Sequence, residues 1–347
     1  MIDAREIARK SILGAAHYSG ISSIAAPFLA GAGAILMLHR VTETPRSPLG
    51  LNSHLAISPH FLDGLLSDLK RSGASVVSLD ELLDELGSGR GRRLVAITAD
   101  DAYLDNLREA LPVLETHNAP FTVYVAPGLT SGKVLPWWEV VEELAAQRDR
   151  LEFSVSGERQ TLDCSTPRLK RDAARRLMEH IAGEIPEAEQ QQFLRDLGAE
   201  DLGGTPRRFM DWDEIRRLSA HPLATIGAHT VHHYNLMRLP EEMAMLEMIR
   251  SAAIIADETG TRPRHFAFPY GYEAAVGERE VRLARQAGFA SAVTTRHGVL
   301  QAGHAEQPHA LPRISVNGRF QRVGYVRTLL SGITTPLSNG GKRFVTI

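Results

Sequence analysis

Short apolar segments bounded by turn residues recur along the chain, with room for a helix between successive segments. Most are apolar throughout rather than alternating, which is typical of parallel strands covered on both faces. We predict strands at residues 34–38, 75–79, 94–98, 121–126, 225–228, 265–268, 291–295 and 311–315. Strands that alternate with helices indicate an α/β protein.

A clear amphipathic helix lies between the first two predicted strands. Ser58 is suited to cap it, Pro59 occupies its first turn, and the pattern stops before Gly73. Its apolar face consists of Phe61, Leu62, Leu65, Leu66 and Leu69. Helices of this kind between the predicted strands indicate a (β/α) barrel of about seven or eight strands. The alternative is an open doubly wound sheet, but a dinucleotide-binding sheet needs glycines directly after an early strand, and Gly31 and Gly33 come before one.

The domain organisation follows from the spacing of these elements. We predict a helical N-terminal extension at residues 1–30 and a barrel domain at residues 31–347. Residues 128–224 are far longer than one crossover requires, so we predict a cap-like helical insertion there.

Composition narrows the function without deciding it. The 347 residues are 43% hydrophobic and 23% charged, with a formal net charge of -2, which argues against disorder and against nucleic-acid binding. The single cysteine, Cys164, excludes an intramolecular disulfide and a thiolate-rich zinc site, so any metal must use histidine and carboxylate ligands.

The N-terminal region contains an uncharged stretch at residues 20–38. Its first part is rich in Gly, Ala, Ser and Pro, and its last part is the first predicted strand, so we expect no stable membrane span. We expect a cytoplasmic protein, with export or membrane association through this stretch as the alternative.

Two adjacent carboxylates, Asp100 and Asp101, follow the predicted strand at residues 94–98. Neighbouring side chains on a regular strand point to opposite faces, so both enter one site only if the strand ends and the backbone curls there. The alternative is that the pair caps the next helix, because aspartate is a favoured capping residue.

Three histidines, His229, His232 and His233, follow the predicted strand at residues 225–228. If this segment is helical, His229 and His233 share a face and both imidazoles can reach one cation, while His232 offers a second pairing. The chain has 14 histidines, so a chance cluster is the alternative.

Together the two segments supply two imidazoles and one carboxylate, the pattern of catalytic zinc sites that keep open positions for water and substrate. We predict that Asp101, His229 and His233 bind a divalent metal and that Asp100 accepts a proton from the attacking water. Zinc is the expected ion, with cobalt or another transition metal as alternatives. Non-haem iron oxygenases also use two histidines and one carboxylate, but an acidic pair at a strand end fits hydrolysis better.

Three segments, Thr-Ala-Asp-Asp-Ala-Tyr at residues 98–103, His-Thr-Val-His-His at 229–233 and Phe-Pro-Tyr-Gly at 268–271, resemble the first three motifs of polysaccharide deacetylases. This family is also called carbohydrate esterase family 4 or the NodB-homology family, and the resemblance covers about residues 34–318. It implies a distorted barrel that removes acetyl groups from N-acetylated sugars. It also implies that Asp100 is the base and that the backbone N–H of Tyr270 is an oxyanion donor.

The sequence departs from these family motifs at several positions. Ala99 and Ala102 replace a phenylalanine and a glycine, and Ala267 replaces an arginine that orients the base. Our hypothesis is that Arg313, at the end of the last predicted strand, takes over from this arginine. The fourth family motif is not found.

The fifth family motif contains a leucine and a histidine that protonates the leaving amine. Leu300 and His304 are the best match, so the resemblance implies His304 as the general acid, with His297 and His309 as competitors. His39 ends the first predicted strand, and we interpret it as a structural histidine. Trp137 and Trp138 could stack on a sugar or belong to the core.

Three functions remain open. The favoured one is metal-dependent deacetylation of an N-acetylglucosamine oligosaccharide or polysaccharide, such as a chitooligosaccharide or an exopolysaccharide. A related hydrolase of another non-peptide amide is the second, because the cap and loops select the substrate. The third is a carbohydrate-binding protein that has lost catalysis, an interpretation motivated by Ala99, Ala102 and Ala267.

Overall fold

Eight parallel strands form the main sheet of the computed structural model, which describes residues 4–45, 47–86, 93–155, 157–202 and 207–347. All eight predicted strands are present, with ends that differ by two residues or fewer. The strands are β1 (Gly33–Leu38), β4 (Ser75–Val77), β5 (Leu94–Ala99), β6 (Phe121–Val125), β9 (Ala224–Ala228), β10 (His265–Ala267), β11 (Ser291–His297) and β12 (Leu311–Ser315).

Seven of these strands close into a barrel. The order around it is β1, β12, β11, β10, β9, β6 and β5, and β5 returns to pair with β1 along its whole length. On the other edge of β5, β4 pairs with the first half and β6 with the second half, so β4 lies outside the closed ring. The barrel is uneven, because β9 and β10 are joined only through Ala228 and Phe266. The predicted distorted barrel is therefore confirmed, and the open-sheet alternative is wrong.

Alternate residues of the barrel strands form one buried cluster that fills the interior. It contains Ile35, Ala96, Tyr124, Ala267, Val293 and Leu311, one from each of six barrel strands. The seventh strand contributes Gly227, where a Cβ would lie 2.4 Å from the Tyr124 ring. Because side chains alternate along a strand, Thr98 and Asp100 follow Ala96 into the barrel, and Arg313 follows Leu311. The alternation of side chains along the strands therefore determines which residues of the site point into the barrel.

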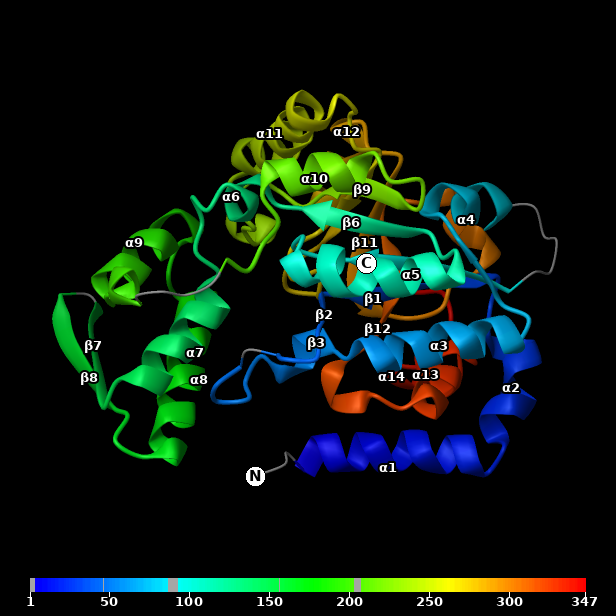
Figure 1. The fold of residues 1–347 in the computed structure, drawn as a ribbon, viewed down its shortest axis with the longest axis horizontal. Helices are drawn as coiled ribbons and strands as arrows, with labels where there is room; N and C mark the ends of the chain where they lie inside the picture. Colours follow the sequence, from blue (N-terminus) through cyan, green and yellow to red (C-terminus); the bar gives the residue numbers. More distant parts are fainter. Residues whose placement is uncertain (1–3, 46, 87–92, 156, 203–206) are drawn as a thin grey trace.

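Helices surround the barrel (Figure 1). The first of them after β1 is α3, and the Ser58 hydroxyl accepts a hydrogen bond from Phe61 N–H at its start, as predicted. The helices around the barrel are α3 (Pro59–Arg71), α4 (Leu79–Leu86), α5 (Leu111–His117), α6 (Pro127–Thr130), α10 (Trp212–Ser219), α11 (Glu241–Thr259), α12 (Glu278–Gln286), α13 (Val323–Leu330) and α14 (Thr334–Ser338). A small two-stranded sheet of β2 (Arg40–Val41) and β3 (Ala56–Ile57) follows β1.

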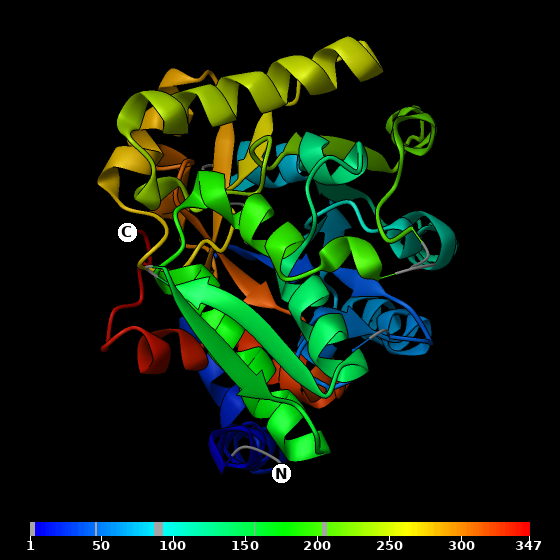
Figure 2. The ribbon, with the colours of Figure 1, turned by 90° about the vertical axis from the view of Figure 1, so that its left-hand side faces the viewer.

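A separate lobe stands beside the carboxyl ends of the barrel strands (Figures 1 and 2). We call it the insertion lobe. It consists of α7 (Trp137–Gln147), the antiparallel pair β7 (Arg150–Val155) and β8 (Glu158–Asp163), α8 (Pro167–Gly183) and α9 (Gln190–Asp196). It has its own hydrophobic cluster, which includes Val141, Leu144, Leu177 and Leu194. α10 packs against β9 and α11 and belongs to the barrel, although the sequence placed it in the insertion.

Two helices precede the barrel, α1 (Ala4–Tyr18) and α2 (Ile21–Leu29). α1 packs on α13, and its Leu13 is buried in the main core. Among the described helices, none alone is long and apolar enough to cross a bilayer. Residues 9–18 and α2 meet the criterion only when taken together, and they are bent by 89° relative to each other.

Candidate metal centre

The three predicted metal ligands meet at the carboxyl end of the barrel. Asp101 follows β5, and His229 and His233 follow β9; all three are buried. Oδ1 of Asp101 lies 3.5 Å from Nε2 of His229 and 3.3 Å from Nε2 of His233. Ligand atoms on a tetrahedral ion with bonds of about 2.0–2.1 Å are separated by roughly 3.3 Å. Oδ1 of Asp101 also has no hydrogen-bond partner among the described residues, so the cluster fits a divalent cation.

Unusual backbone conformations bring these side chains together. The described chain contains six non-glycine residues with positive φ, and five of them are Asp101, Ala102, Thr230, His233 and Tyr270. This left-handed region is costly for residues with a Cβ and tends to occur at functional sites. The turn at Asp101 (φ 70°) is the backbone curl that lets two consecutive aspartates face one site.

The histidine segment is a loop and not the helix considered from the sequence. Nδ1 of His229 lies 2.7 Å from the carbonyl oxygen of Ala267, a contact that makes Nδ1 the donor and leaves Nε2 free to bind a cation. Buried Glu247 of α11 accepts hydrogen bonds from the backbone N–H groups of Val231 and His232, and it contacts Nδ1 of His232 at 2.6 Å. His232 therefore faces Glu247, and the second pairing does not form.

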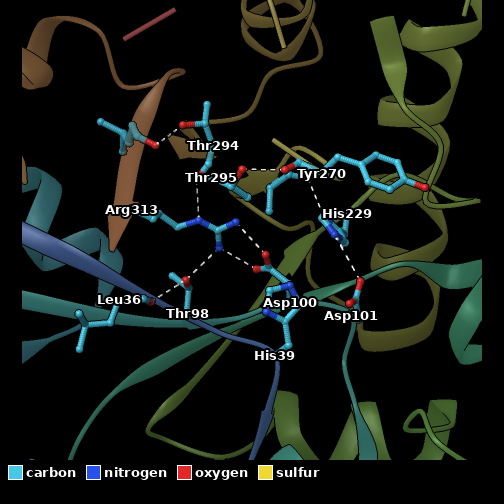
Figure 3. A network of polar contacts seen from close by, with 12 residues as sticks. Leu36, His39, Thr98, Asp100, Asp101, His229, Tyr270, Thr294, Thr295 and Arg313 are labelled. Atoms are coloured by element: carbon cyan, nitrogen blue, oxygen red, sulfur yellow. Dashed lines mark hydrogen bonds and ion pairs between the residues drawn. The ribbon is translucent and has the colours of Figure 1, made fainter. Parts of the chain in front are cut away.

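Asp100 lies inside the barrel mouth, bound to Arg313 (Figure 3). The two guanidinium nitrogens of Arg313 donate to the two carboxylate oxygens of Asp100, each at 2.7 Å. Arg313 also donates to Thr98 Oγ1 at 3.1 Å and to the Thr294 carbonyl at 2.8 Å, and it is 1% exposed. The predicted contact between Arg313 and Asp100 is present. An arginine on β12 thus reaches Asp100, although β10 carries Ala267.

Charge around Asp100 keeps it ionised. Burial raises the pKa of Asp100, but the charge and hydrogen bonds of Arg313 outweigh burial and hold the pKa below its ordinary value. Burial likewise raises the pKa of Asp101, and the neighbouring His233 and His229 lower it further than burial raises it. Both carboxylates are therefore anionic at neutral pH, one facing imidazoles and one facing a guanidinium.

Tyr270 lies against the metal centre. Its ring meets the His233 ring edge-on, with centroids 5.0 Å apart. Within the described residues its backbone N–H makes no hydrogen bond, while its carbonyl oxygen accepts from Thr295 Oγ1 at 2.7 Å. A fixed peptide with a free donor is what the oxyanion role of Tyr270 requires.

The insertion lobe reaches the metal centre through the start of α7. The Trp138 ring packs on the His233 ring with centroids 4.8 Å apart, and its indole N–H donates to Tyr103 Oη at 3.2 Å. Trp137 donates to Tyr270 Oη at 2.9 Å and stacks on the same ring. These contacts hold His233 and Tyr270 against the lobe.

We expect Trp138→Ala to weaken metal affinity by about 10- to 100-fold, because the ring that orients His233 is lost. Competition with a chromophoric chelator measures this affinity. The control is Trp212→Ala, since Trp212 also packs on the barrel core but, among the described residues, its ring has no contact with His233. Equal affinities in the wild type and in Trp138→Ala would show that the lobe does not support His233.

The structure does not bring His304 to the metal centre. Nε2 of His304 lies 2.8 Å from the Val345 carbonyl, and Nδ1 accepts from Gln301 N–H at 2.8 Å. Leu300 bridges to Gly33 at the amino end of β1, whereas the metal ligands lie at the carboxyl ends. This placement contradicts the prediction that His304 is the general acid. Its competitors His297 and His309 are bonded to Thr334 and Phe289.

His39, which we interpreted from the sequence as a structural histidine, lies beside Asp100. It directly follows β1, is half-buried, and has its imidazole beside Asp100 (Figure 3). Its charge is among those that lower the pKa of Asp100. Within the described residues its ring makes no hydrogen bond, so the structural role we predicted has no visible partner. The signal available in the sequence was its position at a strand's carboxyl end.

Comparisons with known proteins agree with this geometry. Residues 179–292 match the family model described as polysaccharide deacetylase. No curated protein matches the sequence significantly.

Solved structures share the fold at low sequence identity. The Streptococcus pyogenes deacetylase PplD in complex with acetate has 17% identity and a TM-score of 0.56, over 85% of this chain and 97% of that one. IcaB from Ammonifex degensii has 20% identity and a TM-score of 0.54, over 86% of this chain and 97% of that one. BC0361, a polysaccharide deacetylase from Bacillus cereus, has 14% identity and a TM-score of 0.53, over 86% of this chain and 68% of that one.

Proposed function

Because this chain belongs to the polysaccharide deacetylase family, a group of carbon–nitrogen hydrolases, we propose that it hydrolyses the acetamide of N-acetylglucosamine units in an oligosaccharide or polysaccharide. The observation that carries this proposal is the division of labour between two adjacent carboxylates. Asp101 faces two imidazoles, while Asp100 is held by Arg313 and remains available as a base.

Asp101, His229 and His233 would hold the cation, which supplies Lewis-acid polarisation and lowers the pKa of water. Asp100 accepts the proton of the attacking water, since it is anionic and lies next to the ligand set. The backbone N–H of Tyr270 donates to the amide oxygen as negative charge develops on it. Arg313 fixes the Asp100 carboxylate in orientation through both oxygens.

The leaving amine needs a proton. Among the imidazoles at this rim that stand outside the ligand set, His232 faces Glu247, whereas the ring of His39 makes no hydrogen bond within the described residues. We assign it the general-acid role that His304 cannot fill. Asn106 Nδ2 donates to the His39 carbonyl at 2.9 Å and the Asp100 N–H donates to the Leu38 carbonyl at 3.0 Å, so the backbone around His39 is tied to the segment that carries the base.

Replacement of His39 by Gln should lower amide hydrolysis by about 10²–10⁴-fold, because the amine would leave unprotonated. Hydrolysis of an aryl acetate should change little, since a phenolate leaves without a proton. Steady-state rates on both substrates make the comparison. A parallel loss on both would assign His39 a structural role.

Aromatic rings beside the metal centre support a sugar substrate. Trp137 and Tyr270 are half-buried and lie nearly parallel, with centroids 6.4 Å apart, and Trp138 meets Trp137 edge-on at 5.8 Å. Aromatic faces of this kind suit the apolar faces of pyranose rings. Trp137 and Trp138 belong to the insertion lobe, so the lobe that supports the metal centre also offers the sugar-binding surface.

Acetate release tests the proposal. The chain, first treated with a chelator, is assayed on a panel of acetylated chitooligosaccharides and poly-N-acetylglucosamine, with and without zinc or cobalt. We expect metal-dependent acetate release. Release without metal, or no release with any metal, would contradict the proposal. If the chain cleaved only a different non-peptide amide, and did so with metal, it would still be a hydrolase, but the proposed substrate would be wrong.

A further inference from the structure

The N-terminal helices carry large apolar side chains on the outside of the molecule. α1 is the outermost layer below α13 and α14 in both views, and α2 lies at the end opposite the insertion lobe (Figures 1 and 2). Five side chains of this segment are exposed: Ile12 59%, Tyr18 79%, Ile21 52%, Ile24 72% and Phe28 76%. We call this set the α1–α2 face. Soluble monomers rarely leave so many large apolar groups together in water.

Within α2 the exposed groups form one stripe. Ile21, Ile24 and Phe28 recur at helical spacing, whereas Ser22 is buried. The helix contains no charged residue, and residues 11–38 contain no Lys, Arg, Asp or Glu. The stripe therefore points away from the protein, and the only polar side chain of α2 that is exposed beside it is the hydroxyl of Ser23.

Basic residues border the α1–α2 face. Residues 1–33 contain Arg5, Arg9 and Lys10 against two acids, Asp3 and Glu6. Residues 316–347 contain five basic residues and no acid, although one of the five, Arg327, is paired with Asp68 of α3. The whole chain has 39 basic and 41 acidic residues, so this surplus is local. The two segments touch, because α1 packs on α13 and the Arg343 guanidinium donates to the Phe28 carbonyl. Exposed Lys342 and Arg343 thus adjoin the end of the apolar stripe.

The geometry excludes a transmembrane helix as the explanation. α2 has nine residues, about 14 Å of helix, against a hydrocarbon core of about 30 Å. Residues 9–18 and α2 are bent by 89°, so they do not form one continuous span. Short helices with an apolar stripe and a basic border instead lie in the plane of a membrane surface.

We propose that the α1–α2 face docks this protein onto the surface of an anionic phospholipid bilayer. The apolar side chains enter the interface, and the basic residues of the two terminal segments contact lipid phosphates. An acidic lipid surface is favoured over a second copy of the chain because this basic border would repel its own duplicate. The metal centre lies at the other end of the barrel from α2, so docking leaves it accessible (Figure 1).

Vesicle co-flotation of the full chain tests this proposal, with phosphatidylcholine vesicles prepared with and without phosphatidylglycerol. We expect binding only to the anionic vesicles. Ile24→Asp combined with Phe28→Asp should weaken it about tenfold or more. Arg9→Gln and Lys342→Gln should each weaken it about fivefold, and added salt should act similarly.

The matched control is Met243→Asp combined with Ile249→Asp. These residues are 46% and 39% exposed on α11, far from α1 and α2, and their replacement should leave vesicle binding unchanged. Acetate release from a soluble substrate should be the same in all these variants, which separates docking from the proposed chemistry. The proposal fails if the wild type does not bind anionic vesicles, or if the double variant of Ile24 and Phe28 binds them as well as the wild type does. It also fails if sedimentation shows a dimer that this variant dissociates.

Discussion

Replacement of Asp100 by Asn is expected to lower the turnover number for acetate release by about 10²–10⁴-fold while metal content stays unchanged. The amide cannot accept a proton from water, so the base is lost. The metal should remain, because Asp101, His229 and His233 form the ligand set without Asp100. Metal analysis and steady-state kinetics on the same sample give both values.

A matched control exists in the same region. Asp105 is also buried and bonded to an arginine, with its Oδ2 2.8 Å from Nε of Arg40. Asp105→Asn removes a buried carboxylate of the same chemistry outside the ligand set, so turnover should fall much less than in Asp100→Asn. If Asp100→Asn lost metal and activity together, Asp100 would be a ligand and not a free base.

Replacement of Arg313 by Met is expected to reduce both stability and turnover. It leaves Asp100 charged and unpaired in the barrel interior, a change that costs about 3–5 kcal/mol in the free energy of unfolding. Denaturant titration measures this loss. The double variant Asp100→Asn with Arg313→Met should recover most of the stability, because neither member of the pair leaves an unpaired charge in the barrel, but it should recover no activity.

The pH dependence of Arg313→Lys follows from the same pair. In the wild type the pKa of Asp100 is depressed, so its contribution to stability is complete above its unfolded pKa and is lost as pH falls through its folded pKa. Lysine keeps the charge but cannot donate to both oxygens, so the pKa of Asp100 should rise. The acid limb of the pH–rate profile should then move to higher pH. An unchanged limb would show that Arg313 does not set the ionisation of Asp100.

The barrel could be predicted from the sequence because its strands are short, continuously apolar segments separated by helices. The convergence of Asp100, Asp101, His229 and His233 at one end of the barrel could be predicted for a related reason. Carboxylates and imidazoles directly after buried strands are costly unless they have a use, and parallel strands place their carboxyl ends on one rim. Arg313 followed from its place at the end of the last strand.

Other features could not be read from the sequence. The positive φ angles of Asp101, Thr230 and His233 depend on tertiary contacts such as those of Glu247. A glycine at these positions would have indicated positive φ in the sequence, but none of the three is a glycine. His304 was misplaced because its spacing to Leu300 gave no information about which end of the barrel the loop covers. His39 was assigned a structural role because no motif residue lies near it in the sequence, so nothing there indicates that its side chain lies beside Asp100.

The most direct test of the central claim is metal stoichiometry by elemental analysis in the wild type, Asp101→Asn, His229→Gln, His233→Gln and Asp100→Asn. We expect a single divalent ion per chain in the wild type and in Asp100→Asn, and a loss of that ion in the other three variants. Full retention of the ion in those three variants, or its loss in Asp100→Asn alone, would contradict the account.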